Sequence, residues 1–127
     1  MFRRVALSLS LALAVLVSLG ALRPAAATEL VMVEEQGCFY CITWKNVVGP
    51  IYPKTPEGAF APLRMIDIDD GVPSDLTFAR KVVYTPTFIL IDAGQEVGRI
   101  EGYPGEDFFW GLLRMMLEAK TEFKGTS

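Results

Sequence analysis

The chain has 127 residues, enough for one domain with a single core, and it carries 12 basic and 15 acidic side chains but no histidine. A net charge of −3 without a basic stripe argues against binding to nucleic acid or to an anionic membrane surface. The lack of histidine excludes serine-type catalytic triads, histidine-based acid–base catalysis and most zinc or haem sites.

The first 27 residues have the pattern of a secretory signal peptide. Two arginines precede an apolar run over residues 5–22, and a stretch of small residues ends at Ala27. We therefore expect cleavage after Ala27 and a mature domain over residues 28–127, located outside the cytoplasm, where disulfides persist. The apolar run is 18 residues long, the lower limit for crossing a bilayer, so an uncleaved membrane anchor is the alternative. Without the leader the net charge is −6.

Short apolar runs bounded by turn residues predict four strands. The strands cover residues 30–33, 63–68, 87–91 and 96–100. The last two are joined by Asp92-Ala93-Gly94-Gln95, which has the composition of a hairpin turn.

Three helices are predicted between and after these strands. The first covers residues 38–48, the second follows Ser74 over residues 75–81, and the third begins at Glu106. Residues 50–62 contain four prolines and are predicted to be irregular. On the last helix, five apolar residues are expected to form the core face: Phe109, Leu112, Leu113, Met116 and Leu117. The order β-α-β, then α, then β-β-α predicts one α/β domain around a central mixed sheet.

Cys38 and Cys41 are the only cysteines, and they lie where a predicted strand is followed by a helix. A C-x-x-C motif in this context is typical of redox proteins. The N-terminus of a helix stabilises a thiolate, so we expect Cys38 to attack a partner disulfide and Cys41 to resolve the mixed disulfide. A purely structural disulfide would close too small a loop to stabilise the fold much. A metal site would lack ligands, and we expect neither a metal nor a cofactor.

Four features together resemble the thioredoxin superfamily. They are the strand at residues 30–33, the Gly37-Cys38-Phe39-Tyr40-Cys41 motif, Thr85-Pro86-Thr87 before an apolar strand, and the Gly102 loop into the last helix. The segment Glu101–Trp110, with Val31–Glu34, is similar more specifically to the small periplasmic thioredoxins encoded with bacterial sulfur-oxidation proteins.

The resemblance implies roles for further residues. Pro86 would be a cis-proline beside the cysteine pair, and Thr85 would present its backbone to an extended client. Phe39 and Tyr40 are expected to add an apolar docking patch. The buried aspartate that thioredoxins have six residues before the first cysteine is replaced by Met32.

Glu34 and Glu35 are the nearest candidates to replace the missing carboxylate through water. Solvated charges at the end of a strand are the favoured interpretation of both.

The resemblance also implies a biological role. The protein would be a monomeric periplasmic reductase that keeps a client's thiols reduced, the implied client being the periplasmic sulfur-carrier protein. A membrane thiol transporter would supply the electrons. Two alternatives stay open: a disulfide donor in oxidative folding, and a partner-binding module with a structural disulfide.

Overall fold

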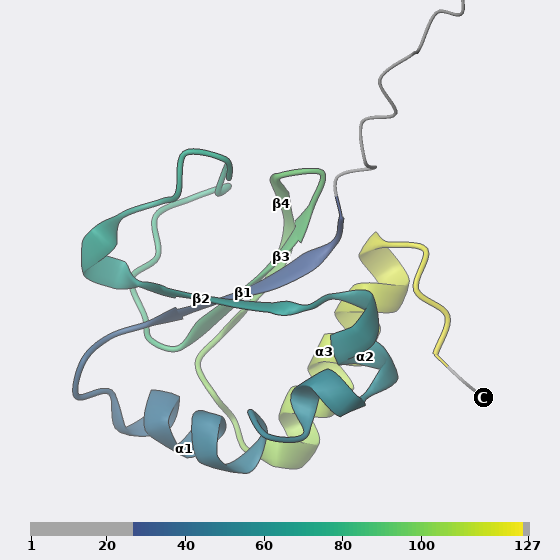
Figure 1. Ribbon diagram of the computed structural model, residues 1–127, viewed down its shortest axis with the longest axis horizontal. Helices are drawn as coiled ribbons and strands as arrows, with labels where there is room; N and C mark the ends of the chain where they lie inside the picture. Colours follow the sequence, from purple (N-terminus) through teal and green to yellow (C-terminus); the bar gives the residue numbers. More distant parts are fainter. Residues whose placement is uncertain (1–26, 126–127) are drawn as a thin grey trace, which may run out of the picture.

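The computed structural model describes residues 27–125, so the predicted signal peptide, apart from Ala27, lies outside the described residues. The elements follow in the order β1 (Glu29–Glu34), α1 (Phe39–Val47), η1 (Tyr52–Lys54), α2 (Pro56–Phe60), β2 (Leu63–Asp67), η2 (Ile68–Asp70), β3 (Thr87–Asp92), β4 (Gln95–Glu101) and α3 (Glu106–Lys120), where η marks a short 3₁₀ helix (Figure 1). Within this part of the chain, no helix is long and apolar enough to cross a bilayer.

The four strands form one mixed sheet in the order β2-β1-β3-β4. β1 runs parallel to β2 and antiparallel to β3, with Met32 opposite Met65 on one side and Phe88 on the other. β3 and β4 form a hairpin whose turn residues Ala93 and Gly94 both have positive φ, as the tight two-residue turns of hairpins require. The architecture confirms the predicted fold class, an α/β domain around a central mixed sheet.

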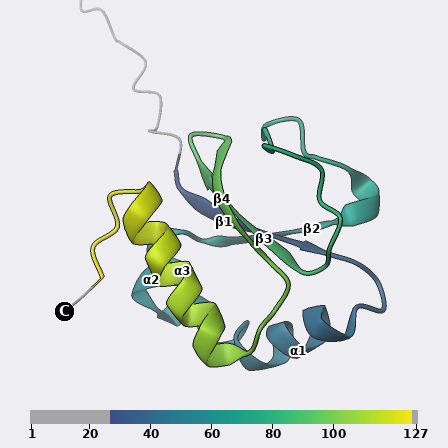
Figure 2. The same ribbon diagram turned by 180° about the vertical axis from the view of Figure 1, so that it is seen from behind.

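The two faces of the sheet are covered by different kinds of structure. All three α-helices lie on one face, and the chain between β2 and β3 crosses the other (Figures 1 and 2). Side chains alternate between faces along a strand, so β1 directs Leu30 and Met32 toward the helices, and Val31 and Val33 away from them. Both pairs are buried, which explains why the sequence of β1 is a continuous apolar run.

An aromatic cluster joins the helices to the sheet. Trp44 of α1 packs against Phe88 of β3 and Phe109 of α3, with ring centroids 5.1 and 5.5 Å apart. The rings of Phe88 and Phe109 are 4.8 Å apart, and Tyr52 packs on Trp44 at 6.1 Å. All four side chains are buried, so the cluster fixes α1, and with it the cysteine pair at its start, relative to the sheet.

The predicted helix over residues 75–81 is wrong. The chain there contains no helix, and Thr77 forms a parallel bridge with Gln95 at the start of β4. Leu76 and Val82 are both buried on the sheet. In an α-helix these two positions would lie roughly 120° apart around the axis, so an irregular extended chain buries both more readily.

Two smaller expectations also differ from the structure. Residues 50–62 are not wholly irregular, because Thr55 caps α2 by accepting a hydrogen bond from the Gly58 N–H at 3.0 Å. On α3, Leu112 is exposed rather than part of the core, since the helix buries a narrow stripe at four-residue spacing. That stripe consists of Phe109, Leu113 and Leu117.

Candidate active site

Cys38 and Cys41 are joined in a disulfide, with their Cα atoms 5.2 Å apart. Cys38 is the N-cap of α1, and its Sγ accepts a hydrogen bond from the Cys41 N–H at 3.1 Å. Cys38 is partly exposed, whereas Cys41 is only 1% exposed. A partner molecule can therefore reach the sulfur of Cys38 more easily than that of Cys41.

A tight turn at the end of β1 brings Cys38 to the start of the helix. Gly37 has φ +81°, a left-handed conformation that favours glycine, and the Cys38 N–H donates to the Glu35 carbonyl at 3.2 Å. The first N–H groups of an α-helix have no partner within the helix, and one of them, that of Cys41, donates to the sulfur of Cys38. The strand–turn–helix context expected from the sequence is present.

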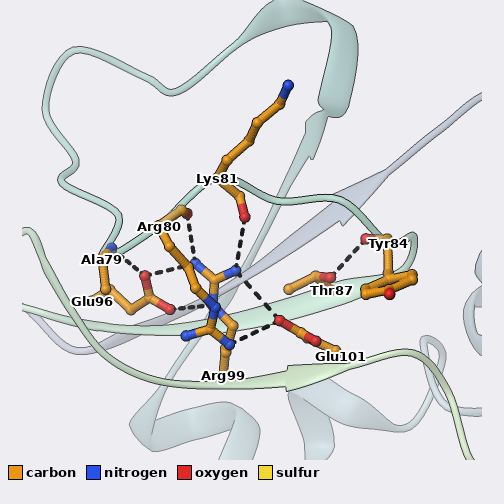
Figure 3. Close-up of polar contacts among 8 residues, drawn as sticks. All are labelled: Ala79, Arg80, Lys81, Tyr84, Thr87, Glu96, Arg99 and Glu101. Atoms are coloured by element: carbon orange, nitrogen blue, oxygen red, sulfur yellow. Dashed lines mark hydrogen bonds and ion pairs between the residues drawn. The ribbon is translucent and has the colours of Figure 1, made fainter.

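The Thr85–Pro86 peptide bond is cis, as the resemblance implied. Pro86 is buried, and its carbonyl accepts a hydrogen bond from the Gly102 N–H at 2.7 Å. The hydroxyl of Thr87, also buried, donates to the Tyr84 carbonyl at 2.7 Å (Figure 3). These two hydrogen bonds anchor the backbone on both sides of Thr85.

The floor beneath the cysteine pair is apolar. Met32 is fully buried and belongs to the same core cluster as Cys41 and Trp44, so this position offers no carboxylate to Cys41. Glu34 forms an ion pair with Lys45 of α1.

Glu35 is the acidic residue that joins the two loops of the site. It is exposed, and its carboxylate accepts a hydrogen bond from the Thr85 hydroxyl at 3.4 Å. The sequence contained no signal for this contact, because the two residues are 50 positions apart.

Exposed apolar side chains lie in the first turn of α1 and in the loop before Thr85. Phe39 and Tyr40 project from the first turn of α1 with their rings edge-to-face at 5.4 Å, and they line a shallow hollow together with residues 103–105. Val83 and Tyr84 are exposed in the loop before Thr85, and neither was among the predicted site residues. The one sequence feature that could have marked them is that two apolar residues precede Thr85-Pro86 without belonging to a strand or helix pattern.

A groove of about 480 Å³ opens on the second face of the sheet, beside Glu35. Its walls are apolar, with Val33 and Val82 among them, and its rim carries Asp67 and Asp69 with Lys81. The groove therefore combines apolar lining residues with charged ones, and it reaches the site at Glu35.

Solved structures of known proteins provide the comparison. The chain is 45% identical to the periplasmic thioredoxin SoxS from Paracoccus pantotrophus, with a TM-score of 0.70, and the match covers 72% of this chain and 96% of that one. The chain belongs to the thioredoxin family. Family membership together with the Cys38-x-x-Cys41 motif makes this chain a thiol–disulfide oxidoreductase.

More distant thioredoxins share the fold alone. A thioredoxin from Fasciola hepatica is 22% identical with a TM-score of 0.54, over 72% of this chain and 82% of that one. The germline-specific thioredoxin Deadhead from Drosophila melanogaster is 16% identical with a TM-score of 0.55, over 71% and 81%. No family model and no curated protein sequence matches this chain.

An ion pair on β4 faces the loop that leads to Thr85. The side chains of Arg99 and Glu96 are 5% and 4% exposed, and the Arg99 guanidinium binds both carboxylate oxygens of Glu96 (Figure 3). Burial alone would raise the pKa of Glu96. The hydrogen bonds from Arg99 and from the Ala79 N–H, with the nearby positive charge, outweigh it and hold the pKa of Glu96 below its ordinary value.

This lowered pKa predicts a loss of stability in acid. Because the unfolded chain binds the proton more readily, Glu96 stabilises the fold at pH values above the ordinary glutamate pKa of about 4.3. That contribution is lost as the pH falls through the lower pKa of the folded state. We expect the free energy of unfolding of Glu96→Gln, measured in urea from about pH 6 to about pH 2.5, to fall less than that of the wild type. Identical pH dependence in the two proteins would contradict the assignment.

Proposed function

We propose that this thioredoxin-family chain is a periplasmic reductase that keeps the thiols of a partner protein reduced. The observation that carries the proposal is the disulfide at the N-terminus of α1, with Cys38 accessible and Cys41 buried behind it. Its 45% identity to a periplasmic thioredoxin supports both the chemistry and the compartment.

The reaction begins with the reduced protein. The thiolate of Cys38, favoured by the free N–H groups of the first turn of α1, attacks one sulfur of a client disulfide. A Cys38–client disulfide forms, and the other client sulfur leaves as a thiolate that takes up a proton. The thiolate of Cys41 then attacks the Cys38 sulfur and expels the second client thiolate, which closes the internal disulfide. Two electrons pass to the client, and a dithiol donor returns them to the protein.

The surroundings of the disulfide suggest how a client is held. Phe39 and Tyr40 offer exposed apolar side chains directly after Cys38, and Thr85, in the loop anchored by Pro86, binds Glu35 just before it. An extended client segment could pair with the backbone of Thr85 while its disulfide approaches Cys38.

The expected cellular setting rests on the leader and on the resemblance. Residues 1–27 would be removed on export, which leaves a mature domain over residues 28–127. By resemblance the client is the sulfur-carrier protein of thiosulfate oxidation, and a membrane thiol transporter is the electron donor. The protein would work as a monomer.

The reduction potential of the Cys38–Cys41 couple tests the direction of electron flow. We expect equilibration with glutathione to give a value near that of thioredoxin, about −270 mV, since a reductase must hold its electrons at a low potential. A value near about −120 mV would identify a disulfide donor and contradict the proposed direction.

A further inference from the structure

Side chains of β4 hold the loop that leads to the active site. The Ala79 N–H donates to the carboxylate of Glu96. The Arg99 guanidinium donates to the Arg80 carbonyl at 2.9 Å and to the Lys81 carbonyl at 3.5 Å (Figure 3). Three consecutive backbone groups of the loop are therefore bound by one ion pair.

Because residues 75–81 form no helix, the backbone groups of this loop need hydrogen-bond partners from elsewhere, and the ion pair supplies some of them. Backbone groups that cover a sheet need hydrogen-bond partners, and here no helix supplies them. The planar guanidinium has five donors, so Arg99 can bind Glu96 and two carbonyls at once.

An irregularity in the hairpin puts both members of the pair on the same face. In a regular strand, residues three apart point to opposite faces. The pairing shifts between Leu90 and Ile91, so that Ile89 lies opposite Arg99 and Ile91 lies opposite Glu96. Because Ile89 and Ile91 belong to the second face of the sheet, both charged side chains reach the loop there.

The segment that the ion pair holds, residues 79–81, lies only a few positions before Thr85 in the sequence. Three residues separate Lys81 from Thr85, and the first of them, Val82, is buried on the sheet. The next two, Val83 and Tyr84, are exposed, and the hydroxyl of Thr87 holds the Tyr84 carbonyl. The backbone from residue 82 to residue 84 is thus fixed at both ends.

We propose that the Glu96–Arg99 ion pair positions the client-binding loop, so that Val83, Tyr84 and Thr85 meet a protein client in one arrangement. The two charged residues act as positioning residues through the loop and do not touch the reacting sulfurs. The inference rests on the proposed function, because it assumes that a protein client docks along Thr85.

A double variant tests the inference without leaving a buried charge unpaired. Glu96→Gln/Arg99→Met removes the ion pair and keeps side chains of similar size. The matched control is Glu57→Gln/Arg114→Met, because Arg114 binds the buried carboxylate of Glu57 at 2.7 and 3.0 Å. That second pair joins α2 to α3 on the helix face, away from the loop.

Amide hydrogen exchange measures the positioning directly. In the Glu96→Gln/Arg99→Met protein we expect the Ala79 amide, which donates to Glu96 in the wild type, to exchange roughly tenfold faster, while the amides of β3 keep their wild-type rates. The control variant should match the wild type at Ala79. Wild-type protection of this amide in the double variant would overturn the inference.

Reaction rates measure the consequence for a client. We expect the rate constant of the reduced double variant with insulin disulfides to fall roughly tenfold, while its rate with oxidised glutathione, which needs only Cys38, stays unchanged. The control should keep both rates. An unchanged ratio of the two rates in the double variant would overturn the positioning role. If the wild type reacts with neither disulfide, the proposed function fails, and hydrogen exchange still decides whether the ion pair holds the loop.

Discussion

Replacing Cys38 with serine is expected to abolish thiol–disulfide exchange, with a loss of roughly 10³-fold or more in the reduction of insulin by dithiothreitol. The reason is that Cys38 carries the accessible sulfur and the contact with the N–H of the first helical turn, whereas Cys41 is buried. A hydroxyl at this position cannot form the mixed disulfide. Turbidity of precipitating insulin measures the loss.

The Cys41→Ser protein should behave differently. It keeps the attacking thiol but cannot resolve the product, so it should accumulate a mixed disulfide with a client protein. Non-reducing electrophoresis and mass spectrometry detect the adduct. The matched control is Cys38→Ser, which keeps one buried thiol and should give no adduct. Adducts in Cys38→Ser but not in Cys41→Ser would reverse the two roles.

The second large effect concerns stability. Phe109→Ala is expected to lower the free energy of unfolding by about 3–5 kcal/mol, because it leaves a cavity where α3 meets the sheet. Phe109 is fully buried against Trp44 and Phe88, and its ring also lies 5.4 Å from that of Trp110. A loss of this size is a large fraction of the stability of about 5–15 kcal/mol typical of native proteins.

The neighbouring residue provides the control. Phe108 is 71% exposed, so Phe108→Ala should change the free energy of unfolding by no more than about 0.5 kcal/mol. Urea unfolding of both variants and of the milder Phe109→Leu measures the difference. Equal losses at positions 108 and 109 would contradict the described orientation of α3.

The sequence by itself determined the local structure around the cysteine pair. The apolar run of β1, the turn at Gly37 and the C-x-x-C motif at the start of a helix are all encoded within about a dozen neighbouring residues. Apolar periodicity and helix-start and helix-stop residues can be read from such short stretches of sequence, so the strands, α1, α3 and the fold class could be predicted. The roles of Cys38 and Cys41 remain predictions that the serine variants test.

Only the tertiary structure decided how the loop before Thr85 is built. The sequence of residues 75–81 is compatible with a helix, but β4 binds this segment in an irregular conformation through Glu96 and Arg99. A strand irregularity brings these two side chains to the same face, and strict alternation along a strand predicts the opposite. The contact between Glu35 and Thr85 likewise depends on two loops meeting in space. Such contacts depend on strand register and long-range packing, which neighbouring residues in the sequence do not specify.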